Sequence, residues 1–496
     1  MQTTEWNFWA NLFMLAQFMM ILLVGMRVML TRHPPGSSFA WLLITAALLV
    51  AGFLLYLFIG ERPLARFRLL RVKRLLEHYY PWAKDRLLPY GPMPLPLNEY
   101  EPLLRLSTNL ARLPLTVGNR VTLLPTSLEA FERILEDIRK AERQIELAYY
   151  IWESGAIVDD IEEALADAAR RGVSVRILCD DFGSAAFLRS PRREALERAG
   201  VRIWRVLPIR FGNFRMSDRI DLRYHRKLVI IDEKVAYTGS LNMIAPKSAA
   251  LGAAPQERWI DAMIRIEGPG TVVLSALWEG DCGLLSNCDE NRDVNAYMEL
   301  FTNGRHEQPG DVPMVCVHSG PYGNEDASLH LILRVISSAR RSLTIVTPYF
   351  VPTETIVSAL LNAASTNVRV RIIVPRLCDS RIVTWGGRRF FEELLNAGIE
   401  IYFFEDGMLH TKAITVDDEV SVFGTVNIDT RSLHLNFEHS MLIINRAFTA
   451  QLNGLFAGYF AGSFRLDPAL WKKRGLLARL REGFSYLASP PKLPVS

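Results

Sequence analysis

Two long apolar stretches open the chain, and alternating strand and helix patterns fill most of the rest. The first apolar stretch runs from about residue 8 to 26 and the second from 39 to 60. As helices, both are long enough to cross a hydrocarbon core about 30 Å thick. A short polar turn, residues 31–38, separates them, so the pattern predicts a transmembrane helical hairpin over residues 1–61. The acidic Glu5 and the lack of a small-residue cleavage site count against a cleavable signal peptide.

Basic residues follow the second apolar stretch closely. Six arginines and lysines occur between residues 62 and 74, before the first acid at Glu77. The positive-inside rule then places the body of the protein in the cytoplasm. Leucines interleaved with these bases predict an interfacial helix on anionic headgroups, at the start of a juxtamembrane segment and tether over residues 62–117.

The remaining chain reads as two related halves, over about residues 118–300 and 310–465. In each half an amphipathic helix ends at Ala-x-Arg, and a short strand, a second helix and an apolar strand follow. This alternation predicts an α/β fold with helices on the faces of a sheet. Residues 294–311 are the expected joint. Residues 466–496 form a basic amphipathic tail that we expect to lie against a bilayer.

Composition supports the membrane segments. The chain has 496 residues, of which 49% are hydrophobic, and a net charge of only +4. It carries no long basic stripe outside the membrane segments, which counts against a nucleic-acid partner. The five cysteines are scattered without zinc-like or disulfide-like spacing, so no metal, disulfide framework or other cofactor is expected.

Both halves carry the same polar motif, H-x-K-x4-D-x6-G-[ST]-x-N. The first copy comprises His225, Lys227, Asp232, Gly239, Ser240 and Asn242. The second copy comprises His410, Lys412, Asp417, Gly424, Thr425 and Asn427. Two such matches at equivalent places of a repeat would arise by chance on the order of once in 10¹⁰ or less. The motifs therefore mark a functional site.

Histidine and lysine two residues apart on a strand point to the same face. Two halves together would offer two imidazoles beside cationic and neutral donors, which suits a phosphodiester substrate. One imidazole attacks phosphorus while the other protonates the leaving oxygen. The lysines, hydroxyls and asparagines of both motifs are predicted to bind the equatorial oxygens of the transition state. Asp232 and Asp417 are expected to hold the loop between two strands and to support the site.

Imidazoles used in this way need carboxylates that orient the ring from its far nitrogen. In the second half Glu438 is the candidate. In the first half Asp261 is the candidate, with Glu257 as the alternative. We therefore expect each half to supply the acid for its own histidine.

A basic and aromatic stretch lies just before the first motif and contains Arg210 and Arg215. It has no clear helical or strand periodicity. We predict that it forms a mouth that draws a lipid headgroup from the membrane plane.

The paired motifs resemble those of the phospholipase D superfamily, and the chain is similar to bacterial cardiolipin synthases of the two-span kind. The similarity covers nearly the full length and includes the segments YYIW, TPYFVP and GTVNIDTRSLHLNFE. Thr425 replaces the serine of the motif, as in many members of the superfamily, and keeps the hydroxyl.

The resemblance implies two pseudo-symmetric phospholipase D-like halves with the site between them. It also implies transfer of a phosphatidyl group from one phosphatidylglycerol to another through a phosphohistidine, giving cardiolipin and glycerol. His225 is assigned as nucleophile and His410 as general acid and then base, although the symmetric motifs leave an exchange of roles open. The expected location is the bacterial inner membrane, as a multi-pass protein with phosphatidylglycerol and anionic bilayer lipids as partners. The oligomeric state stays open.

Other functions on the same repeat remain alternatives. A hydrolase would release phosphatidic acid, because access of water or of an alcohol decides the acceptor. A phosphodiester nuclease fits less well, since the basic stripe that nucleic acid requires is missing. Two complete motifs argue against a catalytically dead membrane scaffold.

Overall fold

The computed structural model describes residues 2–30, 35–56, 99–208, 222–247, 253–254, 257–285, 308–321, 324 and 326–488. Several predicted features lie outside these residues. They are the basic juxtamembrane segment, the mouth with Arg210 and Arg215, most of the joint, the end of the second apolar stretch and the end of the tail. The chain divides into two compact units, which are described separately.

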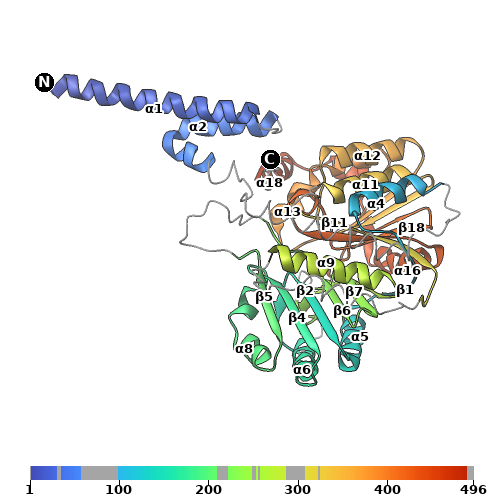
Figure 1. The fold of residues 1–496 in the computed structure, drawn as a ribbon. Helices are drawn as coiled ribbons and strands as arrows, with labels where there is room; N and C mark the ends of the chain where they lie inside the picture. The colour runs from blue at the N-terminus through green and yellow to red at the C-terminus, as the bar shows by residue number, and fades with distance from the viewer. Residues whose placement is uncertain are drawn as a thin grey trace. The chain divides into compact units, whose positions relative to one another are not determined.

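The first unit contains two helices that pack on one another, drawn in blue in Figure 1. Helix α1 spans Gln2–Leu30 and helix α2 spans Pro35–Leu55. Val24 and Val28 of α1 are buried together with Tyr56, which follows α2. These contacts form a small apolar cluster between the helices.

One helical stretch of the described residues, Asn11–Leu30, is long and apolar enough to cross a membrane. Helix α2 holds a shorter apolar stretch, Phe39–Leu48. Large apolar side chains of α1, including Phe13 and Phe18, are exposed. The long apolar helix predicted at the N-terminus is present, whereas a crossing by both helices stays a prediction.

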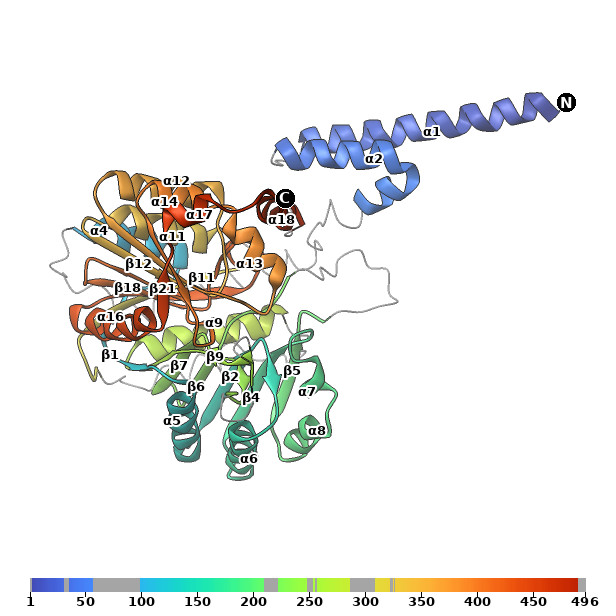
Figure 2. The same ribbon diagram turned by 180° about the vertical axis from the view of Figure 1, so that it is seen from behind.

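The second unit is a mixed α/β body (Figures 1 and 2). The strands of its first half are β1 (Thr116–Leu124), β2 (Gln144–Tyr149), β3 (Trp152–Glu153), β4 (Ser174–Asp180), β5 (Arg202–Val206), β6 (Leu228–Ile231), β7 (Val235–Gly239), β8 (Met243–Ile244), β9 (Trp259–Ile260) and β10 (Met263–Glu267). Those of the second half are β11 (Val312–Ser319), β12 (Ser342–Val346), β13 (Phe350–Val351), β14 (Arg369–Pro375), β15 (Glu400–Phe404), β16 (Met408–Leu409), β17 (Ala413–Val416), β18 (Val420–Gly424), β19 (Ile428–Asp429), β20 (Glu438–Ile444) and β21 (Ser463–Arg465).

The two halves repeat one strand order outward from their joint. The first runs β1-β10-β7-β6-β2-β4-β5 and the second runs β11-β20-β18-β17-β12-β14-β15, with β21 added at the edge. Strands β1 and β11 pair antiparallel, so a single 15-stranded sheet passes through both halves. The last three strands of this shared order, β2-β4-β5 and β12-β14-β15, are parallel to one another in each half. The predicted pair of α/β halves is confirmed.

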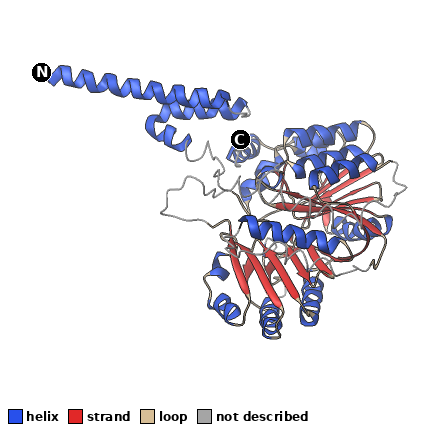
Figure 3. Ribbon diagram, viewed as in Figure 1, coloured by secondary structure: helices blue, strands red, loops and turns tan. Residues whose placement is uncertain are grey.

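Helices flank the strands of both halves, as Figure 3 shows. They are α4 (Glu101–Ala111), α5 (Ser127–Lys140), α6 (Ile157–Arg170), α7 (Ala185–Leu188), α8 (Pro191–Arg198), α9 (Gly270–Leu285), α11 (Ala327–Ser338), α12 (Glu354–Ser365), α13 (Arg381–Arg388), α14 (Phe391–Asn396), α15 (Thr430–His434), α16 (Arg446–Ala461), α17 (Pro468–Lys472) and α18 (Leu476–Ala488). Thr126 caps α5 and Thr353 caps α12, because each side chain accepts a hydrogen bond from a backbone N–H of the first turn. Phe131 and Ile134 of α5 lie in the apolar core against the sheet.

The motif aspartates occupy two equivalent tight turns, Asp232 after β6 and Asp417 after β17. Asp232 and Asp417 adopt left-handed backbone angles, with φ of 53° and 51°, as this kind of hairpin turn requires. The carboxylate of Asp417 accepts hydrogen bonds of 2.8 Å from the backbone N–H groups of Arg340, Arg341 and Ser342. Asp232 does the same at the start of β2. Each aspartate thus ties its turn to the start of the neighbouring strand, β2 or β12. The motif histidine lies at the other end of β6 or β17.

Asp417→Asn is expected to lower the free energy of unfolding by about 2 kcal/mol, because a charged acceptor of buried hydrogen bonds is lost. Asparagine tolerates the left-handed backbone, so the carboxylate alone is tested. Thermal unfolding followed by circular dichroism measures the effect. Asp418→Asn is the matched control, since Asp418 has a similar backbone angle but is exposed. Equal shifts in the two variants would contradict the anchoring role.

Candidate active site

The two motif histidines come from different halves and precede equivalent strands. His225 lies just before β6 and His410 just before β17. Their exposed fractions are 8% and 2%, so both imidazoles are almost fully buried. The apolar runs of β6 and β17 are buried throughout, which fixes each histidine at the end of a rigid strand.

Backbone pairing joins the halves at this point. Tyr224 forms a parallel bridge with Phe437, and the backbone N–H of His225 donates to the carbonyl of Phe437. In the equivalent place β16 pairs with β9, so that Leu409 lies opposite Ile260. The residue before each histidine is therefore held beside the residue before an acid of the other half.

Each histidine is bonded to a carboxylate from the opposite half. Nδ1 of His225 lies 2.9 Å from Oε2 of Glu438. Nδ1 of His410 lies 2.7 Å from Oδ1 of Asp261. The expectation that each half orients its own histidine is wrong, because the two cross-half backbone pairings place each acid beside the other ring.

The motif hydroxyls bond to these same carboxylates. Oγ of Ser240 donates to Oδ1 of Asp261 at 2.6 Å. Oγ1 of Thr425 donates to Oε2 of Glu438, also at 2.6 Å. These hydroxyls hold the orienting carboxylates in place, a role that differs from the predicted contact with phosphate oxygens.

The other predicted polar residues have separate positions. Oδ1 of Asn242 accepts from the backbone N–H of Ile151 at 3.3 Å, and Nδ2 of Asn427 donates to Oγ of Ser432 at 3.2 Å. Glu257 is exposed and its carboxylate accepts from a nearby backbone N–H, so it bonds to neither histidine in the described contacts. The alternative assignment of Glu257 as an orienting acid is therefore not supported by the geometry.

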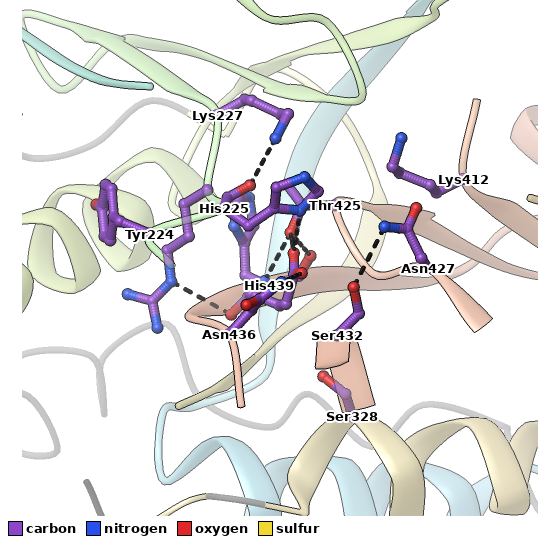
Figure 4. A network of polar contacts seen from close by, with 12 residues as sticks. Tyr224, His225, Lys227, Ser328, Lys412, Thr425, Asn427, Ser432, Asn436 and His439 are labelled. Atoms are coloured by element: carbon purple, nitrogen blue, oxygen red, sulfur yellow. Dashed lines mark hydrogen bonds and ion pairs between the residues drawn. The ribbon is translucent and has the colours of Figure 1, made fainter. Parts of the chain in front are cut away.

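The motif lysines are buried beside the histidines. Nζ of Lys227 donates to the carbonyl oxygen of His225 at 2.7 Å, and Nζ of Lys412 to that of His410 at 2.6 Å. In Figure 4 the lysines lie on either side of the network around His225 and Thr425. Burial lowers the pKa of Lys227 to about 8 and that of Lys412 to about 7, against the opposing pull of the acids. A bound anion would favour the charged form of both lysines.

The protonation states suit nucleophilic attack. Burial lowers the pKa of His225 and of His410 to about 4, although the paired carboxylates oppose the shift. Burial opposes ionisation of Glu438 and Asp261, but their interactions with the imidazoles and lysines outweigh it, and the pKa of each acid is lowered. Near neutral pH the resting site holds two neutral imidazoles and two carboxylates. With Nδ1–H donating to the acid, Nε2 of each ring keeps a free lone pair.

Two aromatic rings cover the imidazoles and were not predicted from the sequence. The ring of Tyr150 lies 5.2 Å from that of His225, and the ring of Trp259 lies 4.5 Å from that of His410. Tyr150 follows β2 and Trp259 belongs to β9. The available signal for Trp259 was its place two residues before Asp261, on the same face of a short strand.

A buried ion pair behind the site was also missed. Arg226 points away from its neighbouring histidine, and its guanidinium pairs with Asp281 of α9. Its Nε donates to the carbonyl oxygen of Glu438 at 3.2 Å, and the hydroxyl of Tyr224 donates to Asp281 at 2.9 Å. The pair fixes the backbone of the acid that orients His225. Alternation along the strand placed Arg226 on the opposite face, but nothing local identified its partner.

Known proteins share this arrangement of two motif-bearing halves. The family described as "Cardiolipin synthase, PLD-like domain" matches residues 134–250 and 332–459. The chain is 36% identical to cardiolipin synthase A of Escherichia coli O1:K1 / APEC, and equally to that of strain K12 / DH10B. Each alignment spans 493 residues and covers 98% of this chain and 99% of the relative. The chain belongs to the cardiolipin synthase family.

The resemblance to this family is thereby confirmed, and membership supports an enzyme that transfers phosphatidyl groups. One matched segment lies in each half. The first contains His225 and Lys227, and the second contains His410, Lys412 and Glu438. A solved structure, phosphatidylserine synthase of Haemophilus influenzae Rd KW20, shares the fold, with a TM-score of 0.57 and 16% identity. The structural alignment covers 78% of this chain and 96% of that protein.

Two more histidines lie behind the site of this family member, His439 fully buried and His318 partly buried. His318 on β11 and His439 on β20 sit directly opposite one another in the sheet. Burial lowers the pKa of His318 to about 3 and holds that of His439 well below its usual range, with Arg226 adding to both shifts. Four imidazoles, three of them buried and one partly buried, therefore resist protonation in the folded protein.

The catalytic body is expected to lose stability as pH falls from about 6.5 towards 4. The unfolded chain binds protons near the ordinary histidine pKa, whereas the folded chain resists them, so acid favours unfolding. The thermal transition temperature measured from neutral pH to about pH 4.5 reports the slope. His439→Gln should reduce this slope, and His330→Gln, at an exposed position on α11, is the control. Identical slopes in both variants would argue against the linkage.

Proposed function

We propose that this chain is a cardiolipin synthase that transfers a phosphatidyl group from one phosphatidylglycerol to another. The observation that supports this most directly is the pair of buried imidazoles, each with Nδ1 bonded to a carboxylate of the opposite half. Such a pair provides one nucleophile and one proton carrier on the two sides of a phosphodiester. Family membership supplies the class of substrate.

In the first step Nε2 of His225 attacks the phosphorus of a phosphatidylglycerol. The bond from phosphorus to the headgroup oxygen breaks, and His410 gives a proton to that oxygen, so glycerol leaves. His410 takes up this proton on Nε2 from solvent when the diester binds, because the negative charge of the diester raises the pKa of His410. The phosphatidyl group then rests on His225, whose positive charge is stabilised by Glu438.

In the second step a hydroxyl of another phosphatidylglycerol enters the site. His410, now neutral, removes the hydroxyl proton, and the oxygen attacks phosphorus. The bond between phosphorus and Nε2 of His225 breaks, which releases cardiolipin and restores the neutral nucleophile. Lys227 and Lys412 stabilise the equatorial oxygens in both steps.

The membrane arrangement belongs to the same proposal. The long apolar helix α1 and the shorter apolar stretch of α2 support a multi-pass protein of the bacterial inner membrane. The bases between residues 62 and 74 favour a cytoplasmic catalytic body. Donor and acceptor lipids would then reach the site by lateral diffusion.

Incubation of the full chain with phosphatidylglycerol alone tests the reaction. Mass spectrometry should find cardiolipin and glycerol in equal amounts. His225→Ala and His410→Ala should each lower the rate by at least about 10³-fold, since one imidazole cannot replace the other. His330→Ala, at an exposed position, is the control. Phosphatidic acid without cardiolipin would replace this proposal with the hydrolase.

The aromatic cover favours transfer over hydrolysis, because it limits the approach of water to the intermediate. Trp259→Ala is therefore expected to raise the ratio of phosphatidic acid to cardiolipin several-fold. Trp204→Ala removes a partly buried tryptophan on the edge strand β5 and should leave the ratio unchanged. Loss of both products in equal proportion in Trp259→Ala would refute a role in excluding water.

A further inference from the structure

Helix α18 packs with its polar side inward and its apolar side outward. Glu482 and Ser485 are buried, with exposed fractions of 5% and 3%. Leu477, Phe484 and Leu487 are 83%, 72% and 77% exposed. A helix that simply covers a soluble core shows the reverse arrangement. The apolar side of α18 is therefore available to another apolar phase.

Specific contacts hold the helix in this orientation. The guanidinium of Arg481 lies 4.3 Å from the ring centre of Trp385 on α13, and that of Arg389 lies 4.9 Å from the ring of Tyr486. Glu482 forms an ion pair of 3.3 Å with Arg474. Turning the apolar side inward would break these contacts and bury leucines in place of the ion pair. Specific side-chain contacts thus keep the apolar side of α18 facing outward.

The exposed apolar surface continues beyond α18. Ile382 on α13 and Leu377 in the preceding loop are 49% and 52% exposed. We call the set the apolar face; it comprises Leu377, Ile382, Leu470, Leu476, Leu477, Leu480, Phe484 and Leu487. Most of the large apolar side chains exposed on the described part of the catalytic body belong to it. Such a concentration of exposed apolar side chains marks an interaction surface.

The apolar face lies at the same edge of the sheet as the catalytic histidines. Leu377 follows the carboxyl end of β14, which is parallel to β12. Strand β17 is antiparallel to β12 and starts with Ala413 opposite Val346, the last residue of β12. His410, just before β17, therefore lies at the carboxyl edge that Leu377 and α13 also occupy. Phe182, 61% exposed, has the equivalent position after β4 in the first half.

The charges around the apolar face select the partner. Within residues 468–488, all of which the structure describes, Glu482 is the single acid and is buried. The bases of this segment are Lys472, Lys473, Arg474, Arg479 and Arg481. A second copy of the chain would bring two basic surfaces together, which is unfavourable. Four of these bases, Lys472, Lys473, Arg479 and Arg481, are exposed, whereas Asp379, an exposed acid, lies between Leu377 and Ile382. An apolar face with an excess of exposed bases matches the interface of an anionic bilayer.

We propose that the apolar face docks on an anionic phospholipid bilayer and presents the active-site edge to the lipids. This contact is made by the catalytic body itself. It gives lipid headgroups a short path to the buried histidines. Its test does not require that the lipid product be cardiolipin.

Amide hydrogen exchange of the full chain in nanodiscs tests the docking. Discs of phosphatidylcholine are compared with discs that also contain phosphatidic acid, which has no headgroup to lose. Exchange over Leu476–Ala488 is expected to slow about tenfold in the anionic discs. The double variant Leu480→Asp, Phe484→Asp should abolish this protection. Leu128→Asp is the matched control, because Leu128 is 53% exposed and its helix, α5, lies away from α18 in Figures 1 and 2.

Activity provides the second readout. The double variant should lose about tenfold of its rate on phosphatidylglycerol in vesicles, while its rate on a short-chain, monomeric phosphatidylglycerol stays unchanged and reports correct folding. Protection of α18 in detergent, with a doubled mass, would assign the face to a second copy and overturn the proposal. Exchange that is equally fast in all discs would also overturn it. A wild-type chain that makes no cardiolipin but shows lipid-dependent protection would refute the proposed reaction alone.

Discussion

The two carboxylate–imidazole hydrogen bonds that cross between the halves are the contacts on which the site depends. Each hydrogen bond satisfies a buried carboxylate. Removal of its partner would leave the carboxylate unpaired and lower the free energy of unfolding by about 3–5 kcal/mol. Because His225 reaches Glu438 and His410 reaches Asp261, correct docking of the halves and correct orientation of the imidazoles are one event. A catalytic geometry that depends on docking cannot form in one half alone.

The surrounding structure makes these bonds reproducible. The sheet runs without interruption from one half to the other through β1 and β11, and the bridges before each histidine fix the register locally. Hydroxyls from Ser240 and Thr425 hold the carboxylates from a second direction. Arg226 holds the backbone of Glu438 from behind. Each orienting carboxylate is bonded to both an imidazole and a hydroxyl, and such connected networks specify a single arrangement.

Local patterns in the sequence were enough for the two α/β halves, for the histidines and lysines of the motifs, and for the two orienting acids as candidates. The histidine and lysine of each motif directly precede β6 or β17, so the buried apolar strands that follow place them at the end of the sheet. The crossing of the acids did not follow, because His225 and Glu438 are 213 residues apart and their pairing depends on how the halves dock. The amphipathic pattern of α18 was visible, but periodicity does not say which side of a helix packs inward. The partners of Arg226 and the ring beside His410 could not be predicted either, because both are tertiary contacts between segments far apart in the sequence.

The crossed pairing also bears on how such a chain can originate. A polypeptide equivalent to one half would hold a histidine and an acid that do not meet, and two copies related by a two-fold axis would complete both pairs. The sheet joint at β1 and β11 would be the subunit interface of that homodimer. Once the copies are fused in one chain, the two halves can differ in sequence. One imidazole is now paired with glutamate and lies beside a tyrosine ring, and the other is paired with aspartate and lies beside a tryptophan ring, so donor and acceptor sides of one substrate can be shaped separately.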